Sequence, residues 1–140
     1  MKNILFALIS STILTSYGIL PWNSTKHGPL LIIDTSAANF GMVPNRGFVE
    51  HIFALRNAGD STLRITGVYP SCGCTVASLN DSIVPVGQST KLLIRLDAKD
   101  KMPGGFEKAV YLSSNSRDTS RRWFIFYGRF IQADTNQTPK

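Results

Sequence analysis

The chain has 140 residues, of which 43% are hydrophobic and 17% charged, so its size suits one folded domain with a targeting segment and argues against two domains or a disordered chain. The net charge is +6, but the basic residues are scattered from Arg46 to Arg129 with acids between them. One tight cluster, Arg117, Arg121 and Arg122, brackets Asp118 and is typical of a solvated loop. We therefore expect no nucleic-acid partner.

The N-terminal segment, residues 1–22, predicts export. Residues 4–22 carry no charged side chain, and Lys2 supplies the positive charge that precedes the apolar part of a signal peptide. Ser16-Tyr17-Gly18 offers a small-x-small cleavage site after Gly18. Either this segment is a cleaved signal peptide, or it stays as an N-terminal membrane anchor helix. Residues 23–29 would then be a linker.

The anchor alternative depends on length. Nineteen uncharged residues would span roughly 28 Å as a helix, close to the thickness of a hydrocarbon core, and Trp22 would lie at the interface. With Lys2 on the cytoplasmic side, both alternatives place the rest of the chain in the periplasm or outside the cell. The leader has no cysteine to acylate, which argues against a lipoprotein.

From Leu30 onward, short runs rich in Val, Ile, Phe and Tyr alternate with Gly, Pro, Asn and Ser clusters, which predicts strands and turns. After a short strand at 30–34, the Gly, Pro and Asn of 40–47 predict a connection. Residues 48–57 then alternate as a strand, with one face listed in order as Val49, His51, Phe53 and Leu55.

The next segment, Asn57-Ala58-Gly59-Asp60, predicts a turn, because Gly59 can take a positive φ and Asn57 can cap it. A hairpin-like reversal into a strand at 63–69 should follow. Residues 71–75 read SCGCT and lead into a weakly apolar stretch that ends at Leu79.

The C-terminal half contains the clearest alternation, at 90–98, after a turn at 85–88. Pro103-Gly104-Gly105 predicts a second turn, with Gly104 and Gly105 defining it, and a strand at 106–113 follows. Residues 122–131 form an aromatic strand, for which packing in the core or at an edge is favoured over base stacking. The tail, 133–140, is polar.

Together these elements predict an all-β fold over residues 30–132. About seven strands without a covering helix indicate an immunoglobulin-like sandwich of two antiparallel sheets, preceded by the N-terminal signal or anchor helix.

The SCGCT segment, with the Asn57-Ala58-Gly59 turn before it, resembles the bacterial domain-of-unknown-function family 1573. The likeness extends through most of residues 40–130. The matching segments are 53–59, 63–65, 71–75, 83–87, 103–106 and 113–115. Such domains are similar to the Ig-like modules of Hydin and major sperm protein, which implies binding or scaffolding and no characterised reaction. Val86 departs from the pattern, since a glycine is common directly after the proline there.

Cys72 and Cys74 are the two cysteines of the chain. Positions i and i+2 of a strand lie roughly 6.4 to 6.8 Å apart, the outer limit for a disulfide, and Gly73 could fold the chain enough to close that gap. The small ring would add only about 1.6 kcal/mol. The pair could therefore be packed sulfur atoms, an inert disulfide, a redox pair, or ligands for Cu(I). Zinc fits less well, because only His27 and His51 could complete its ligands.

No catalytic motif is evident, and His51 shares a strand face with apolar residues, so enzymatic activity is not indicated. We expect a binding or structural module of the cell envelope that contacts another envelope protein and, if the leader is uncleaved, the membrane. No cofactor is expected unless copper binds. The alternative is a small thiol-redox or Cu(I)-handling protein that uses Cys72-Gly73-Cys74.

Overall fold

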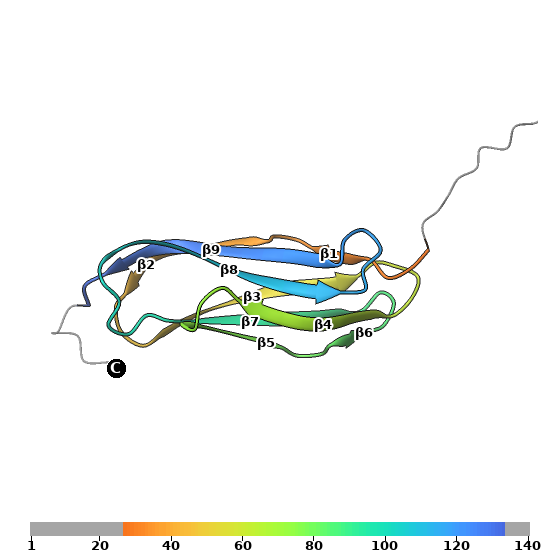
Figure 1. The fold of residues 1–140 in the computed structure, drawn as a ribbon, viewed down its shortest axis with the longest axis horizontal. Helices are drawn as coiled ribbons and strands as arrows, with labels where there is room; N and C mark the ends of the chain where they lie inside the picture. Colours follow the sequence, from red (N-terminus) through yellow and green to blue (C-terminus); the bar gives the residue numbers. More distant parts are fainter. Residues whose placement is uncertain (1–26, 134–140) are drawn as a thin grey trace, which may run out of the picture.

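The computed structural model describes residues 27–133, which fold into two β-sheets packed face to face, with the strands running along the long axis of the domain (Figure 1). The strands are β1 (Leu31–Ile33), β2 (Ala37–Pro44), β3 (Phe48–Asn57), β4 (Leu63–Pro70), β5 (Thr75–Leu79), β6 (Ile83–Val84), β7 (Ser89–Asp97), β8 (Gly104–Ser114) and β9 (Arg121–Ile131). The predicted leader lies outside the described residues. Among residues 27–133, no helix has the length and apolarity needed to cross a membrane.

The smaller sheet has the strand order β1-β3-β7-β5, and the larger sheet has the order β2-β9-β8-β4-β6. The all-β class and the two-sheet sandwich agree with the sequence prediction. The number of strands does not, because the described residues form nine strands where about seven were expected. The additional strands are the two edge strands of the larger sheet, β2 with eight residues and β6 with two.

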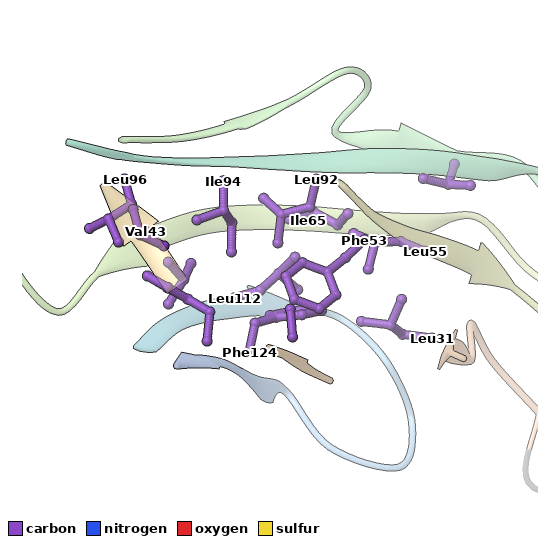
Figure 2. Packing of buried hydrophobic residues seen from close by; sticks show 14 of the residues in the cluster. Leu31, Val43, Phe53, Leu55, Ile65, Leu92, Ile94, Leu96, Leu112 and Phe124 are labelled. Carbon is purple, nitrogen blue, oxygen red and sulfur yellow. The ribbon is translucent and has the colours of Figure 1, made fainter. Parts of the chain in front are cut away.

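The core lies between the sheets and follows the period-two alternation of the strands. In β7, Leu92, Ile94 and Leu96 are fully buried and point toward Leu112 and Phe124 of the opposite sheet (Figure 2). Each such side chain contributes roughly 1.5 to 3 kcal/mol when it is fully buried. The predicted inward face of β3 is also correct, since Phe53 and Leu55 are buried while Val49 and His51 are half-buried.

The expected connection at 40–47 is wrong, because most of it belongs to strand β2. This strand pairs in parallel with β9, so the sandwich is not purely antiparallel. The register shifts between Asn39 and Gly41, where Gly41 adopts a φ of +66°. The glycine that suggested a loop therefore marks a β-bulge, and Pro44 ends an edge strand, the place where a strand tolerates proline.

The expected hairpin between β3 and β4 is also wrong. β3 pairs with β1 and β7, whereas β4 pairs with β6 and β8 in the other sheet. The chain therefore crosses from one sheet to the other after Asn57. The alternation within each strand does not reveal this, because a hairpin and a crossing between sheets both bury one face of each strand.

Candidate functional site

The SCGCT segment connects the two sheets, since β4 belongs to the five-stranded sheet and β5 to the four-stranded one. Backbone hydrogen bonds hold both ends of the segment. The Ser71 amide donates to the Ala109 carbonyl at 2.8 Å, and the Asp97 amide donates to the Cys74 carbonyl at 2.9 Å. The loop is thus attached to β8 on one side and to the end of β7 on the other.

In this loop Cys72 and Cys74 are joined by a disulfide, with their Cα atoms 5.3 Å apart. That separation is shorter than in an extended strand, because the chain turns at Gly73. Gly73 does not have a positive φ, and a Cβ placed on it would meet nothing within 4 Å. The turn that brings the cysteines together therefore does not require a glycine.

An open pocket of about 300 Å³ lies beside the disulfide. Its lining residues are Cys74, Lys101, Met102, Gly105, Phe106, Lys108 and Phe130. Two of these side chains are cationic and none is acidic. The pocket therefore places Cys74 of the disulfide in a positively charged setting, which favours anions and thiolates.

The other cysteine, Cys72, is not among the lining residues, and its sulfur has a partner of its own. Its Sγ lies 3.3 Å from the Oγ1 atom of Thr75, within hydrogen-bond distance for sulfur. Thr75 is buried and begins β5, so its hydroxyl is held in place. This hydroxyl could donate to a Cys72 thiolate if the disulfide opened.

The two histidines considered as metal ligands have other surroundings. The ring of His51 packs against Phe53 at 4.6 Å and Phe40 at 6.0 Å, while Nδ1 of His27 lies 2.6 Å from an oxygen of Asp60. Within residues 27–133, no group of three or more His, Cys, Asp or Glu side chains is arranged to hold a metal ion. Cu(I) binding by the two cysteines would first require reduction of the disulfide.

Asn57, predicted to shape the turn after β3, is completely buried at the corner where the chain changes sheets. Its Nδ2 donates to the carbonyls of Ser61 at 2.8 Å and Val84 at 2.9 Å. Its Oδ1 accepts the amides of Gly59 at 3.0 Å and Leu30 at 3.3 Å. Every hydrogen-bonding position of the amide is thereby used, and one side chain ties three segments together.

Gly59 is required at this corner for space and not for its φ. A Cβ on Gly59 would lie 2.3 Å from the Gly28 carbonyl oxygen and 2.5 Å from the Leu30 amide nitrogen. The positive φ expected from the sequence is absent. Asp60, next in the chain, accepts the Gly28 amide at 2.6 Å and pairs with His27, and these contacts lower its pKa below the ordinary 3.8.

Gly104 and Gly105, the other predicted turn residues, are the first two residues of β8 and pair with Phe130 and Arg129. Gly104 adopts a φ of +153°, which favours glycine, whereas Gly105 lines the pocket beside the disulfide. The turn itself therefore precedes them.

The loop that carries the arginine cluster is held together by contacts of Asp118. Arg122 makes an ion pair with Asp118, which also accepts hydrogen bonds from the Ser116 hydroxyl and the Thr119 amide. Desolvation raises the pKa of Asp118, but these hydrogen bonds and Arg122 outweigh it and lower the pKa overall. This loop resembles the solvated loop expected from the sequence.

A row of three aromatic side chains crosses the outer face of the five-stranded sheet. Tyr69, Tyr111 and Trp123 are register partners on β4, β8 and β9. The tyrosine rings stack at 4.5 Å with an interplanar angle of 16°, and Trp123 lies 5.2 Å from Tyr111. Trp123 is 56% exposed and Tyr69 45%, so the row faces solvent.

The same face continues along β9 with Ile125 and Tyr127, which are 39% and 43% exposed. Arg121 and Arg129 lie on this side of β9 at the two ends of the apolar row. We define Tyr69, Tyr111, Trp123, Ile125 and Tyr127 as the aromatic face. Of the aromatic strand, for which packing in the core or at an edge was expected, Phe124, Phe126 and Phe130 are buried in the core, whereas Trp123 and Tyr127 lie on the outer face. Residues 123–127 are apolar on both faces of the strand, and this was the signal in the sequence that some of them would be exposed.

The outer face of the four-stranded sheet also exposes apolar side chains, with Phe48 63% and Val76 61% exposed. It has a shallow groove of about 360 Å³ lined by Phe48, Val76, Ser78, Leu93 and Arg95. Arg95 lies over the Phe48 ring at 5.4 Å and pairs with Glu50, so charged groups cover part of its apolar surface.

Several solved structures share this fold. A protein of unknown function from Porphyromonas gingivalis W83 has a TM-score of 0.65 and 14% identity, over 79% of this chain and 51% of that protein. The chain thus spans about half of that relative. The human CEP192 PapD-like domain 7 has a TM-score of 0.58 and 12% identity, over 95% of this chain and 100% of that domain. At these identities the likeness establishes the fold alone.

A third similar structure is the secreted serine protease VesC from Vibrio cholerae, with a TM-score of 0.55 and 13% identity over 75% of this chain and 24% of the protease. No curated protein matches the chain. A family model does match residues 31–126, which is more than half of the sequence and includes the SCGCT loop, the Asn57 corner and most of the aromatic face. The chain therefore belongs to the family of proteins of unknown function DUF1573.

Proposed function

We propose that this protein is an exported binding module of the cell envelope, which attaches to another envelope protein through the aromatic face. The observation that supports the proposal is the row of Tyr69, Tyr111 and Trp123, whose rings contact one another and of which Tyr69 and Trp123 are exposed to solvent. Exposed apolar surfaces of this kind are uncommon on proteins that act alone and are typical of interaction sites.

The composition of the face favours a protein partner of a particular kind. Trp, Tyr and Arg are the residue types that most often dominate binding energy at protein interfaces. Here the aromatic side chains form the centre, and Arg121 and Arg129 flank it on β9. The complementary surface would be apolar at its centre and acidic at its edge.

Site-specific photocrosslinking tests this proposal. A photoreactive phenylalanine analogue at position 123 should give one dominant crosslinked product with an envelope protein in cells that express the full chain. The same analogue at Ile52, 55% exposed on the outer face of the other sheet, serves as the control. Equal products from both positions, or none from position 123, would contradict the proposed interface.

The part of the proposal that concerns export rests on the uncharged segment 4–22. N-terminal sequencing of the protein isolated from cells, combined with fractionation, tests it. A chain that begins at Ile19 in the periplasmic fraction indicates a cleaved signal peptide, and an intact Met1 in the membrane fraction indicates an anchor. Recovery of the intact chain from the cytosol would contradict export.

We propose thiol chemistry at Cys72 and Cys74 as a second candidate function. Its support is the pocket at Cys74, with Lys101 and Lys108 in its lining. Free thiols should be counted by mass spectrometry before and after reduction, and the reduced chain titrated with Cu(I). An unreactive pair that binds no copper would contradict this candidate. A Cys72→Ser/Cys74→Ser chain that folds normally but loses a cellular phenotype would support it.

A further inference from the structure

We propose that the pocket beside the disulfide is a thiol-exchange site for small thiols that carry a carboxylate, with Cys74 as the sulfur that is attacked. This inference rests on the second candidate function and adds the class of substrate and the direction of attack. It stands on three features of the loop: the pocket, its two lysines, and the contact between Cys72 and Thr75.

The positions of the two cysteines determine which sulfur an incoming thiolate attacks. Cys74, half-buried against the core, lines the pocket and Cys72 does not, so a molecule in the pocket meets Cys74 first. Exchange proceeds by attack of a thiolate on one sulfur with departure of the other. The incoming thiolate would therefore bond to Cys74 Sγ, and Cys72 would leave as a thiolate.

The contact between Cys72 and Thr75 favours this choice of leaving group. The Thr75 hydroxyl lies 3.3 Å from Cys72 Sγ and can donate a hydrogen bond to the thiolate as it forms. Thr75 is 5% exposed, so its hydroxyl is already in place before the reaction. Exchange is faster when the departing thiolate is stabilised.

Lys101 and Lys108 select the substrate. Both line the pocket, and neither Asp nor Glu is among its lining residues. A carboxylate on the incoming thiol would be attracted by the ammonium groups, as would the thiolate itself. Phe106 and Phe130 form an apolar wall that suits a short carbon chain between the thiol and the carboxylate.

The exchange between two small thiols and the protein disulfide takes place in two steps. The first thiolate forms a mixed disulfide with Cys74 and releases the Cys72 thiolate, which takes up a proton. A second thiolate then attacks the substrate sulfur of the mixed disulfide and releases the Cys74 thiolate. Two thiols are thus oxidised to one small disulfide, and the protein disulfide is reduced to two thiols. The reverse reaction reduces a carboxylate-bearing disulfide.

Stopped-flow reduction of the full chain with three small thiols tests the charge preference. The probes are 3-mercaptopropionate, 2-mercaptoethanol and cysteamine, which are anionic, neutral and cationic, with each rate constant divided by the fraction of thiolate present. The measured quantity is the ratio of the 3-mercaptopropionate rate to the cysteamine rate. In the Lys101→Gln/Lys108→Gln chain this ratio should fall about tenfold, the effect expected for two partly exposed charge pairs.

Matched variants separate the site from general effects of charge. Lys91→Gln removes a lysine from the exposed side of β7, outside the pocket lining, and should leave the ratio unchanged. Thr75→Val should slow reduction by all three thiols, whereas Thr75→Ser keeps a hydroxyl and should restore the rate. Mass spectrometry of the chain trapped early in the reaction should find the small thiol on Cys74.

The outcomes distinguish this inference from the second candidate function. If the disulfide is reduced readily but the ratio is the same in the wild-type and double-lysine chains, thiol chemistry stands and the substrate class is wrong. A small thiol trapped on Cys72 overturns the direction of attack. A chain whose cysteines are already free, or whose disulfide resists all three thiols, overturns both.

Discussion

Two of the connections that carry the chain from one sheet to the other are built in different ways. The corner after β3 is held by the buried side chain of Asn57, which makes four hydrogen bonds, and by close backbone packing around Gly59. The loop after β4 is held at its centre by a covalent bond between Cys72 and Cys74, with open space around Gly73. The side chain that holds the first connection is fully buried, whereas the second has half-buried cysteines, with Cys74 packed against the core on one side and lining an open pocket on the other.

This difference indicates separate roles for two short segments that each contain a glycine. A buried polar hub that satisfies every donor and acceptor fixes a single geometry. A disulfide across a three-residue ring restricts the unfolded chain only slightly, so stability gives little reason to place it there. We therefore expect the Asn57 corner to determine folding stability and the cysteine loop to be available for chemistry.

The largest effect should come from Asn57→Ala. This change leaves two carbonyls and two amides without their partners in a buried corner and should cost about 3 kcal/mol. Urea unfolding followed by Trp fluorescence measures the free energy of unfolding. Asn80→Ala, at an exposed position, is the matched control and should change this free energy by less than about 0.5 kcal/mol. Equal effects of the two changes would contradict the role assigned to Asn57.

Addition of one methyl group should destabilise the fold at Gly59 but have little effect at Gly73. Gly59→Ala places a Cβ against the backbone of Gly28 and Leu30 and should destabilise the fold by about 2 kcal/mol. Gly73→Ala meets open space without a positive φ and should stay within about 0.5 kcal/mol of the wild type. The same denaturation experiment compares them, and a Gly73→Ala chain as unstable as Gly59→Ala would remove the contrast between the connections.

Loss of the disulfide should have a smaller effect than either change at the corner. The Cys72→Ser/Cys74→Ser chain should lose no more than about 1.6 kcal/mol, the loop-closure entropy of a three-residue ring. The wild-type chain in a reducing buffer should behave in the same way. Unfolding of the domain upon reduction, detected by circular dichroism, would show instead that the disulfide is structural.

The smallest effect concerns acid stability at the Asn57 corner. Because contacts with Gly28 and His27 lower the pKa of Asp60 in the folded chain, its carboxylate stabilises the fold above the ordinary value of 3.8. That contribution disappears as the pH falls through the lowered pKa. Asp60→Asn should therefore be less stable than wild type at neutral pH, and the two should converge as the pH falls through the lowered pKa of Asp60. A difference that stays the same from neutral pH into strong acid would exclude this linkage.

The sequence predicts some parts of the fold well because their signals are local. The alternation of 48–57 and 90–98 follows from one buried face, and these segments are β3 and, within a residue at each end, β7. Asn57 was recognised as a turn residue from its neighbours. Its second role, tying β6 and the start of β1 to the corner, depends on residues Val84 and Leu30, which are distant in sequence.

Only some residues of the candidate site could be identified from the sequence. Cys72 and Cys74 were identified as a pair from their spacing, but Lys101, Lys108 and Thr75 had no signal that linked them to the cysteines. The β7–β8 connection and the start of β8 bring both lysines to the loop. The aromatic face also escaped prediction, because strand periodicity separates two faces without showing which one the second sheet covers.

The sequence by itself determined the β class, the inward residues of the central strands and the proximity of the two cysteines, because each depends on residues a few positions apart. Only the tertiary structure decided that the chain crosses between sheets at Asn57, that β2 runs parallel to β9, and that Tyr69, Tyr111 and Trp123 form one row. These features depend on pairing between strands far apart in the chain, which the burial of a whole core selects and no local pattern encodes.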